Sequence, residues 1–260
     1  MKAGPTARLL FWVAVAASAA ELEPGSLPRS WRTGGPNCLE QPAWEIHEYN
    51  PAFYILRQSG CIHYEKPFLY LLFGKDRAML VDTGAGESDA AAVVSRLIAQ
   101  RAANLQSPVP SLIVTHSHGH GDHTAGDKAF AGQPNTSVVA ASVEAEQKAF
   151  GIVRWPEQIG SIDLGNRVVD VIATPGHQPA HLAYYDRRTG ILLTGDHLYP
   201  GRLYVTDFAQ YLASTKRLVD FTRDKTVSHI LGCHIEQTRT PYVDYPTGTK
   251  YQRGEHSLVP

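Results

Sequence analysis

The feature that most constrains this chain is a histidine-rich segment directly after a short apolar run. Residues 111–115 (Ser-Leu-Ile-Val-Thr) predict a buried strand. The next residues, 116–126, hold four of the chain's 12 histidines and one aspartate, separated mainly by glycine and other small residues. Imidazole and carboxylate groups are ligands suited to zinc, and glycine lets the backbone curl around an ion. We therefore expect a metal-binding loop at the end of a strand, in a fold that brings further ligands to it.

The order of the residues decides the register of the ligands within this loop. A His-x-His-x-Asp-His pattern fits at only one place in the segment. A register beginning at His116 would need an aspartate at position 120, where the chain has a histidine. We therefore expect His116 to lie outside the metal site. The predicted ligands from the loop are His118, His120, Asp122 and His123.

Three further candidate ligands stand at the ends of apolar runs later in the chain. Thr-Pro-Gly-His places His177 on a tight turn, Thr-Gly-Asp places Asp196 at a strand end, and Gly-Cys-His places His234 after the last predicted strand. A single His or Asp at a strand end is more often structural than functional. Their order after the histidine loop favours one shared metal site.

The rest of the chain predicts a mixture of strands and helices. In the last predicted helix, Leu212, Thr215, Leu218 and Val219 are expected to face inward. Strands and helices do not alternate strictly, which favours a layered α/β sandwich with helices outside the sheets. Besides the strand at 111–115, strands are expected at 46–56, 68–73, 79–81, 137–141, 168–173, 182–185, 191–193 and 228–232, and helices at 87–103, 143–150 and 207–221.

Five spaced elements resemble those of the metallo-β-lactamase superfamily, over roughly residues 44–240. They are residues 81–84 (Val-Asp-Thr-Gly), the histidine loop, 174–177, 194–196 and 232–234. The resemblance implies a four-layer αββα sandwich with two metal ions at the edge of its sheets. It also implies that Asp82 supports the histidine loop from behind the ligands. The implied ligands are His118, His120 and His177 for one metal and Asp122, His123 and His234 for the second, with Asp196 bridging both.

This ligand set implies hydrolysis. A divalent metal lowers the pKa of bound water from 15.7 toward about 7, so a metal-bound hydroxide is the expected nucleophile. Asp122 is the expected catalytic acid–base group, because it can orient the nucleophile and then pass a proton to the leaving group. We expect two zinc ions as cofactors, with iron or manganese as alternatives that the same ligands accept.

The bridging residue narrows the class of hydrolase. In the resembled superfamily, zinc β-lactamases typically carry Cys or Ser where this chain has Asp196, whereas lactonases and thioesterases similar to glyoxalase II carry the aspartate. The stretch after His234 is expected to lack the helical region with which glyoxalase II proteins bind glutathione. Tyr199 stands where N-acyl homoserine lactonases have a tyrosine that contacts substrate, so it is a second catalytic candidate. The alternative is that Tyr199 only fills the pocket wall.

The expected function is therefore hydrolysis of a small ester, thioester, lactone or lactam. The alternatives are a β-lactamase proper, a phosphodiesterase, and an iron-dependent, sulfur-oxidising relative of the same fold. A formal net charge of −1 and the lack of a Lys/Arg stripe in the sequence disfavour nucleic acid as a partner and leave a small-molecule substrate. Nothing in the sequence indicates the oligomeric state.

The N-terminal segment predicts export. Lys2 and Arg8 precede an apolar run at residues 9–17, and Ser-Ala-Ala at 18–20 matches a signal-peptidase site. The run is about half of the ~20 residues that span a bilayer, so no stable membrane anchor is expected. We expect a signal peptide at residues 1–20, an extended Pro- and Gly-rich leader at 21–43 and one catalytic domain at 44–260, in a secreted or periplasmic protein.

The three cysteines agree with an oxidising compartment. Cys38 and Cys61 are the expected disulfide pair, because both precede the half of the chain that holds the ligands. Cys233 directly precedes His234. We expect it to be a small buried residue at a strand end, with metal ligation as the alternative.

Overall fold

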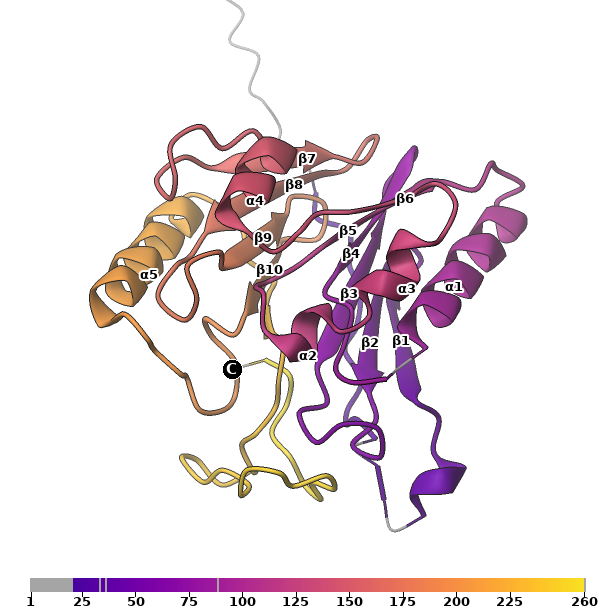
Figure 1. Cartoon of the computed structure of the whole chain (residues 1–260), viewed down its shortest axis with the longest axis vertical. Coiled ribbons are helices and arrows are strands. Elements are labelled where there is room, and N and C mark those ends of the chain that lie inside the picture. Colours follow the sequence, from indigo (N-terminus) through magenta and orange to yellow (C-terminus); the bar gives the residue numbers. More distant parts are fainter. Residues whose placement is uncertain (1–20, 33, 36, 88, 260) are drawn as a thin grey trace, which may run out of the picture.

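The computed structural model describes residues 21–259, except 33, 36 and 88. The predicted signal peptide lies outside these residues. Two β-sheets face one another, and helices cover their outer faces (Figure 1). This confirms the predicted αββα sandwich. Within the described part of the chain, no helix is both long and apolar enough to cross a membrane.

The first sheet has six strands in sequence order, antiparallel from β1 to β4 and parallel from β4 to β6. The single strand expected at 46–56 is wrong: β1 and β2 form a hairpin there, and the Asn50 side chain accepts a 2.9 Å hydrogen bond from the Ala52 N–H at its turn. The strands are β1 (Trp44–Asn50), β2 (Phe53–Gln58), β3 (Phe68–Phe73), β4 (Arg77–Val81), β5 (Ser111–Thr115) and β6 (Thr136–Val138). The helices of this half are η1 (Cys38–Glu40), α1 (Ala90–Asn104), α2 (Gly121–Thr124) and α3 (Asp127–Ala131).

The second sheet has five strands in the order β11-β10-β9-β8-β7. Only the β10–β11 pair in it is parallel. The short strand β7 was not expected from the sequence. The elements of this half are α4 (Val143–Phe150), β7 (Gly160–Asp163), β8 (Val168–Ala173), β9 (Leu182–Asp186), β10 (Ile191–Gly195), α5 (Phe208–Thr222) and β11 (His229–Gly232).

Three separate apolar clusters hold the four layers together. The largest lies between the sheets and includes Phe53, Tyr70 and Tyr184. A second joins the outer face of the first sheet to α1 and α3, and a third joins the outer face of the second sheet to Leu218 of α5. Each fully buried large apolar side chain stabilises the fold by about 1.5–3 kcal/mol. The sheets therefore form a rigid base for the loops at their edge.

Helix α5 buries a different face from the one expected. Leu218 is buried as predicted, but Leu212 and Val219 are 59% and 58% exposed. The buried face includes Ser214, whose hydroxyl donates a 2.7 Å hydrogen bond to the Pro175 carbonyl. Gly176, at a φ of +137°, lies so close that a Cβ atom there would meet the Tyr211 Cα at 2.5 Å. The helix thus packs on the turn that carries His177, which favours small and polar residues over apolar ones.

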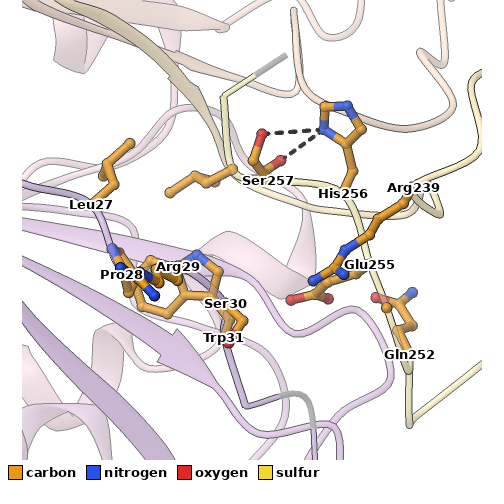
Figure 2. Close-up of a pocket in the computed structure, with 12 residues that line it drawn as sticks. Leu27, Pro28, Arg29, Ser30, Trp31, Arg239, Gln252, Glu255, His256 and Ser257 are labelled. Carbon is orange, nitrogen blue, oxygen red and sulfur yellow. Dashed lines mark hydrogen bonds between the residues drawn. The ribbon is translucent and has the colours of Figure 1, made fainter.

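The leader and the C-terminal segment come together at one side of the sandwich. Trp31 of the leader is buried and packs edge-on against Phe68, with ring centroids 4.9 Å apart. The composition of the leader did not predict this contact. A cavity of about 340 Å³ separates the leader from the C-terminal segment, with Trp31 on one side and His256 on the other (Figure 2). Beside it, Arg57 and Glu255 form a buried ion pair, with Arg57 Nη2 2.9 Å from Glu255 Oε2.

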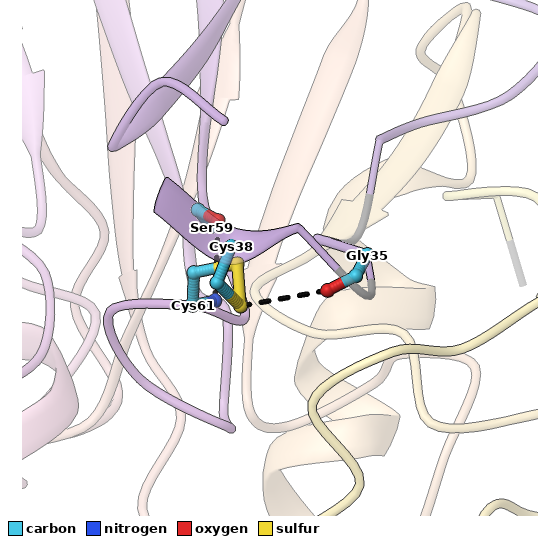
Figure 3. Close-up of a disulfide and its surroundings, with 4 residues drawn as sticks. All are labelled: Gly35, Cys38, Ser59 and Cys61. Carbon is cyan, nitrogen blue, oxygen red and sulfur yellow. Dashed lines mark hydrogen bonds between the residues drawn. A yellow bond between two sulfur atoms is a disulfide. The ribbon is translucent and has the colours of Figure 1, made fainter. Parts of the chain in front are cut away.

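A disulfide joins Cys38 and Cys61, which confirms the expected pairing (Figure 3). It ties the leader to the loop between β2 and β3. The Cys61 N–H also donates a 3.1 Å hydrogen bond to the Ser59 hydroxyl. The disulfide therefore fixes Cys38 of the leader beside the start of this loop, 23 residues further along the chain.

Candidate metal centre

The predicted ligands come together in two neighbouring clusters. Asp122 and His123 belong to the short helix α2, which lies at one edge of the sandwich (Figure 1). Each ligand follows the end of a strand of one of the two sheets. The histidine loop and α2 follow β5, and the turn with His177 follows β8. Asp196 follows β10 and His234 follows β11, which lie side by side and parallel. The topology therefore brings residues far apart in sequence to a single place.

The first cluster consists of three imidazole nitrogens. His118 Nε2 lies 2.9 Å from His120 Nδ1, and His177 Nε2 lies 3.1 Å from each of them. A tetrahedral zinc ion with bonds of about 2.0–2.1 Å would hold its ligand atoms about 3.3 Å apart. The nitrogens are thus close to the spacing that a single divalent ion requires.

The second cluster combines two imidazoles with a carboxylate. Asp122 Oδ2 lies 3.0 Å from His123 Nε2 and 3.2 Å from His234 Nε2. The two imidazole nitrogens are 3.4 Å apart. These spacings also match those expected around a zinc ion.

Asp196 spans the two clusters with its two oxygens. Oδ2 lies 3.7 Å from His177 Nε2 and 3.9 Å from His118 Nε2. Oδ1 lies 3.3 Å from His234 Nε2 and 3.7 Å from His123 Nε2. Oδ1 is buried and accepts no hydrogen bond from any residue that the structure describes, an arrangement that is costly without a compensating partner. The donor atoms and this oxygen therefore fit two divalent metal ions that share Asp196.

Backbone carbonyls hold the ligand rings in place from behind. His177 Nδ1 donates to the Tyr204 carbonyl at 2.6 Å, and His234 Nδ1 donates to the Glu65 carbonyl at 3.0 Å. A ring that donates from one nitrogen must keep the lone pair of its neutral form on the other. In the neutral form of both rings, which is the form that binds metal, that other nitrogen is the Nε2 that faces the cluster.

Asp82 is buried behind the histidine loop and contacts several of the surrounding side chains. Its carboxylate accepts hydrogen bonds from the Ser117 N–H at 2.6 Å and from the Ser117 hydroxyl at 2.9 Å. It also lies 2.9 Å from His123 Nδ1, and the Cys233 thiol donates to it at 3.2 Å. Asp82, His123 and Cys233 form a third compact group, but its members are already bonded to one another. This arrangement favours a structural reading of Cys233 over metal ligation.

Two other histidines near the clusters, His116 and His181, form hydrogen bonds with neighbouring residues. His116 Nε2 lies 2.8 Å from Asp127 Oδ1, and His116 is a member of neither ligand cluster. His181 accepts a 3.2 Å hydrogen bond from the Asp196 N–H. The approach is this close because residue 195 is glycine: at its φ of +53°, a Cβ atom would lie 2.9 Å from His181 Nε2.

Charge in the cluster keeps both aspartates ionised. Burial alone would raise the pKa of Asp122, but the charge of His123 and the hydrogen bonds from His123 and His234 bring it below its usual range. The pKa of Asp196 is lowered against the same effect of burial by His234 and His123. Ionised carboxylates are the form that binds metal.

A cavity of about 320 Å³ opens over the clusters. Tyr199 lines it, but its hydroxyl donates to the Arg202 carbonyl, and its ring lies 5.4 Å from that of His234. This supports wall-filling, and the substrate contact by Tyr199 stays a prediction. Sequence reasoning missed the wall residues Tyr64, Glu65, Glu236 and Thr247, which lie in loops without a recognisable motif. The lining residues are Tyr64, Glu65, His120, Asp122, His177, Asp196, Tyr199, Tyr204, His234, Glu236 and Thr247.

Known proteins are similar to this chain in sequence. A hydroxyacylglutathione hydrolase of Chelativorans sp. is 30% identical over 121 residues, 45% of this chain and 47% of that protein. One of Aeromonas hydrophila is 29% identical over 164 residues, 62% of this chain and 59% of that protein. The chain thus spans less than two thirds of the length of these curated relatives.

A solved structure agrees in fold. The metallo-β-lactamase from Pontibacter korlensis superposes with a TM-score of 0.54 at 19% identity, covering 74% of this chain and 91% of that one. The sequence profile of the metallo-β-lactamase superfamily matches residues 67–234, which include every predicted metal ligand. The chain therefore belongs to the metallo-β-lactamase superfamily.

Proposed function

We propose that this protein is a hydrolase that uses two zinc ions to cleave a small ester, thioester, lactone or lactam. The observation that carries the proposal is Asp196, whose two oxygens face two separate ligand clusters. Hydrolases acting on hydroxyacylglutathione, which is a thioester, are among the relatives. The metallo-β-lactamase neighbour supports only the fold, because it shares too little sequence.

Each of the two clusters would hold one metal ion. Three neutral imidazoles would hold the first ion, and a carboxylate with two imidazoles would hold the second. Ions held in this way would supply Lewis acidity, lowering the pKa of water and polarising the carbonyl of the substrate. Zinc suits these nitrogen and oxygen donors, and iron and manganese remain the alternatives that metal analysis must separate.

Asp122 is the residue placed to handle protons. Its carboxylate is 13% exposed and lines the cavity, so it faces both a bound substrate and the second cluster. Being ionised, it can accept a hydrogen bond from the attacking water and so orient it. The proton it takes up can then pass to the leaving alcohol or thiol. Positioned acid–base groups of this kind typically contribute 10²–10⁴-fold to rate.

We further propose that the protein acts outside the cytoplasm. The disulfide between Cys38 and Cys61 supports this, since such bonds persist in oxidising compartments. The apolar N-terminal segment supplies the route for export. Fractionation of cells that express the full chain, with N-terminal sequencing of the product, tests the proposal. Full-length protein confined to the cytoplasm would contradict it.

The test of the proposed activity is a hydrolysis screen with elemental analysis on the same preparation. The panel holds acyl thioesters, homoserine lactones, nitrocefin and bis-p-nitrophenyl phosphate. We expect about two zinc ions per chain and turnover of a carboxylic ester, thioester or lactone. Turnover of the phosphodiester alone would move the protein to another reaction class. A single iron ion after growth with both metals would overturn the zinc assignment.

A further inference from the structure

The wall of the cavity away from the ligand clusters has a distinct composition. It consists of three tyrosines and two glutamates, with a threonine beside them. Among the described lining residues there is no lysine and no arginine. We call this side the tyrosine–glutamate wall and define it as Tyr64, Glu65, Tyr199, Tyr204 and Glu236.

Two cations beside this wall, Lys66 and Arg202, are not among the residues that line the cavity. Lys66 is 1% exposed, and its ammonium donates to the carbonyls of Tyr64 and of Thr249 in the C-terminal segment, yellow in Figure 1. Arg202 bonds to the Tyr245 carbonyl and lies 3.2 Å from Glu236 and 3.6 Å from Asp244. Both positive groups are thus engaged by other residues of the protein.

The carboxylate of Glu65 is the least compensated charge of the wall. Its partners are the Tyr64 hydroxyl at 3.1 Å and the imidazole of His63 at 3.4 Å. A third of the side chain is exposed, at 33%. The charge of Glu65 is also the main reason why the pKa of Tyr64 is raised, with burial and the charge of Asp122 adding to the effect. Glu65 therefore places a partly offset negative charge in the wall, on the side of the cavity away from the ligand clusters.

The tyrosines make the same surface attractive to a positive group. Tyr64 and Tyr204 are 36% and 52% exposed, so parts of both side chains remain open to solvent. An aromatic face attracts an ammonium group within about 6 Å of its centre, and tyrosine is among the better rings for this. Carboxylates beside such rings add a direct charge attraction, which a carboxylate on the substrate would meet as repulsion.

We propose that the tyrosine–glutamate wall is a subsite for a positively charged alkylammonium group on the substrate. The proposal rests on the hydrolase function above and names the substrate class of the same site. With a cavity of about 320 Å³, the substrate is small: an ester or thioester whose carbonyl reaches the ligand clusters while its ammonium lies against the wall. Anionic substrates, including thioesters of carboxylate-bearing thiols, are disfavoured.

The first test compares three thioacetates that differ in charge and little in size. They are acetylthiocholine, its neutral analogue with carbon in place of nitrogen, and the thioacetate of mercaptopropionate. We expect kcat/KM to fall in that order, with the cationic substrate about tenfold ahead of the neutral one. The advantage should shrink as salt is raised, because partly exposed charges are screened. Equal kcat/KM for all three, or a preference for the anion, would overturn the subsite.

Variants connect the preference to the wall. Glu65→Gln keeps the shape of the side chain and should reduce the ratio of kcat/KM for the cationic and neutral substrates severalfold. Glu144→Gln is the matched control, since it removes one negative charge from the exposed face of α4. It should leave the ratio unchanged. An equal drop in both variants would attribute the preference to net charge and would contradict the proposal.

Binding separates the subsite from the hydrolase function. Choline is titrated into the zinc-loaded protein and into Glu65→Gln, with its neutral carbon analogue as the reference. Choline binding that weakens in Glu65→Gln, without any hydrolysis, would support the subsite and contradict the proposed function. Hydrolysis without a charge preference would do the reverse. Failure of both hydrolysis and choline binding would overturn both.

Discussion

The backbone N–H of Asp196 donates to His181 Nε2 over 3.2 Å, so a buried histidine sets the position of the carboxylate between the two clusters. Because Nε2 accepts, the proton of the neutral ring is on Nδ1, 2.7 Å from the Thr174 hydroxyl. Burial lowers the pKa of His181 well below its ordinary value, which keeps the ring neutral and able to accept. The structure thus links the Thr174 turn to the carboxylate that both clusters share.

Replacing His181 should therefore weaken metal binding although the residue is not a ligand. We expect His181→Ala to lower metal affinity by 10–100-fold, as loss of a partner behind a metal ligand commonly does. His229→Ala removes a histidine at the start of β11, where it contacts Tyr49, at the opposite end of the strand from the clusters, and should leave metal content unchanged. Competition with a chromophoric chelator measures both. Wild-type affinity in His181→Ala would show that Gly195 and its neighbours position Asp196 unaided.

The register of the histidine loop can be tested with two neighbouring histidines. We expect His118→Ala to lose the first metal and the activity, because it removes one of three clustered nitrogens. His116→Ala should keep both metals, since His116 bonds to Asp127 instead. Loss of that partly buried hydrogen bond should still reduce the free energy of unfolding, by about 1 kcal/mol. Elemental analysis and chemical denaturation of the two variants give the answer, and equal metal loss would refute the register.

Asp122→Asn tests the two roles assigned to this carboxylate. The amide keeps the shape and one oxygen but removes the charge and the proton acceptor. We expect kcat to fall by ~10²-fold or more. The second metal should bind more weakly, while the first should stay, because its three imidazoles are untouched. Metal titration beside kinetics on the best substrate of the screen measures both, and near wild-type turnover with both metals bound would mean that another group handles the proton.

The ligand edge could be predicted from the sequence because its residues are locally marked. His118 and His120 stand in a glycine-rich loop after an apolar strand, and Asp196 and His234 also follow strands directly. Neighbouring strand ends lie at the same edge of a sheet. Residues that directly follow such strands are therefore expected to lie close together in space. The pattern of strands and helices predicted a layered α/β sandwich, and the resemblance to the superfamily implied its αββα form.

The cavity wall and some element boundaries could not be predicted, because tertiary contacts decide them. Glu65 and Thr247 meet at the cavity through the C-terminal segment, which Lys66 holds by donating to the Thr249 carbonyl at 2.8 Å. No local motif marks such a long-range contact. On α5, apolar periodicity predicted that Leu212 faces inward. The turn at Gly176 packs closely against the helix, and the face that carries Ser214 is buried instead. At the hairpin turn after β1, the Asn50 side chain accepts a hydrogen bond from the Ala52 N–H, a contact that apolar periodicity does not mark.

Glu146 should make the stability of the protein depend on pH. This residue of α4 is 1% exposed, and neither carboxylate oxygen has a hydrogen-bond partner among the residues that the structure describes. Burial raises its pKa from 4.5 to about 9, so the folded protein keeps the proton at neutral pH while the unfolded chain releases it. The unfolded state then binds fewer protons, and the free energy of unfolding falls as pH rises between these two values.

Glu146→Gln removes this titration with little change in shape. The stability that the proton contributes is complete below about pH 4.5 and is lost as the pH rises toward about 9. The stability of the variant relative to wild type should therefore increase with pH, by up to ~1.4 kcal/mol per pH unit for a single fully shifted group. Urea unfolding of both zinc-loaded proteins between about pH 6 and pH 8 measures the difference, in which metal effects common to both cancel. Glu144→Gln, exposed on the same helix, should give a difference that stays flat. If Glu146→Gln also gives a flat difference, the carboxyl is ionised in the folded protein and has a partner that offsets its burial.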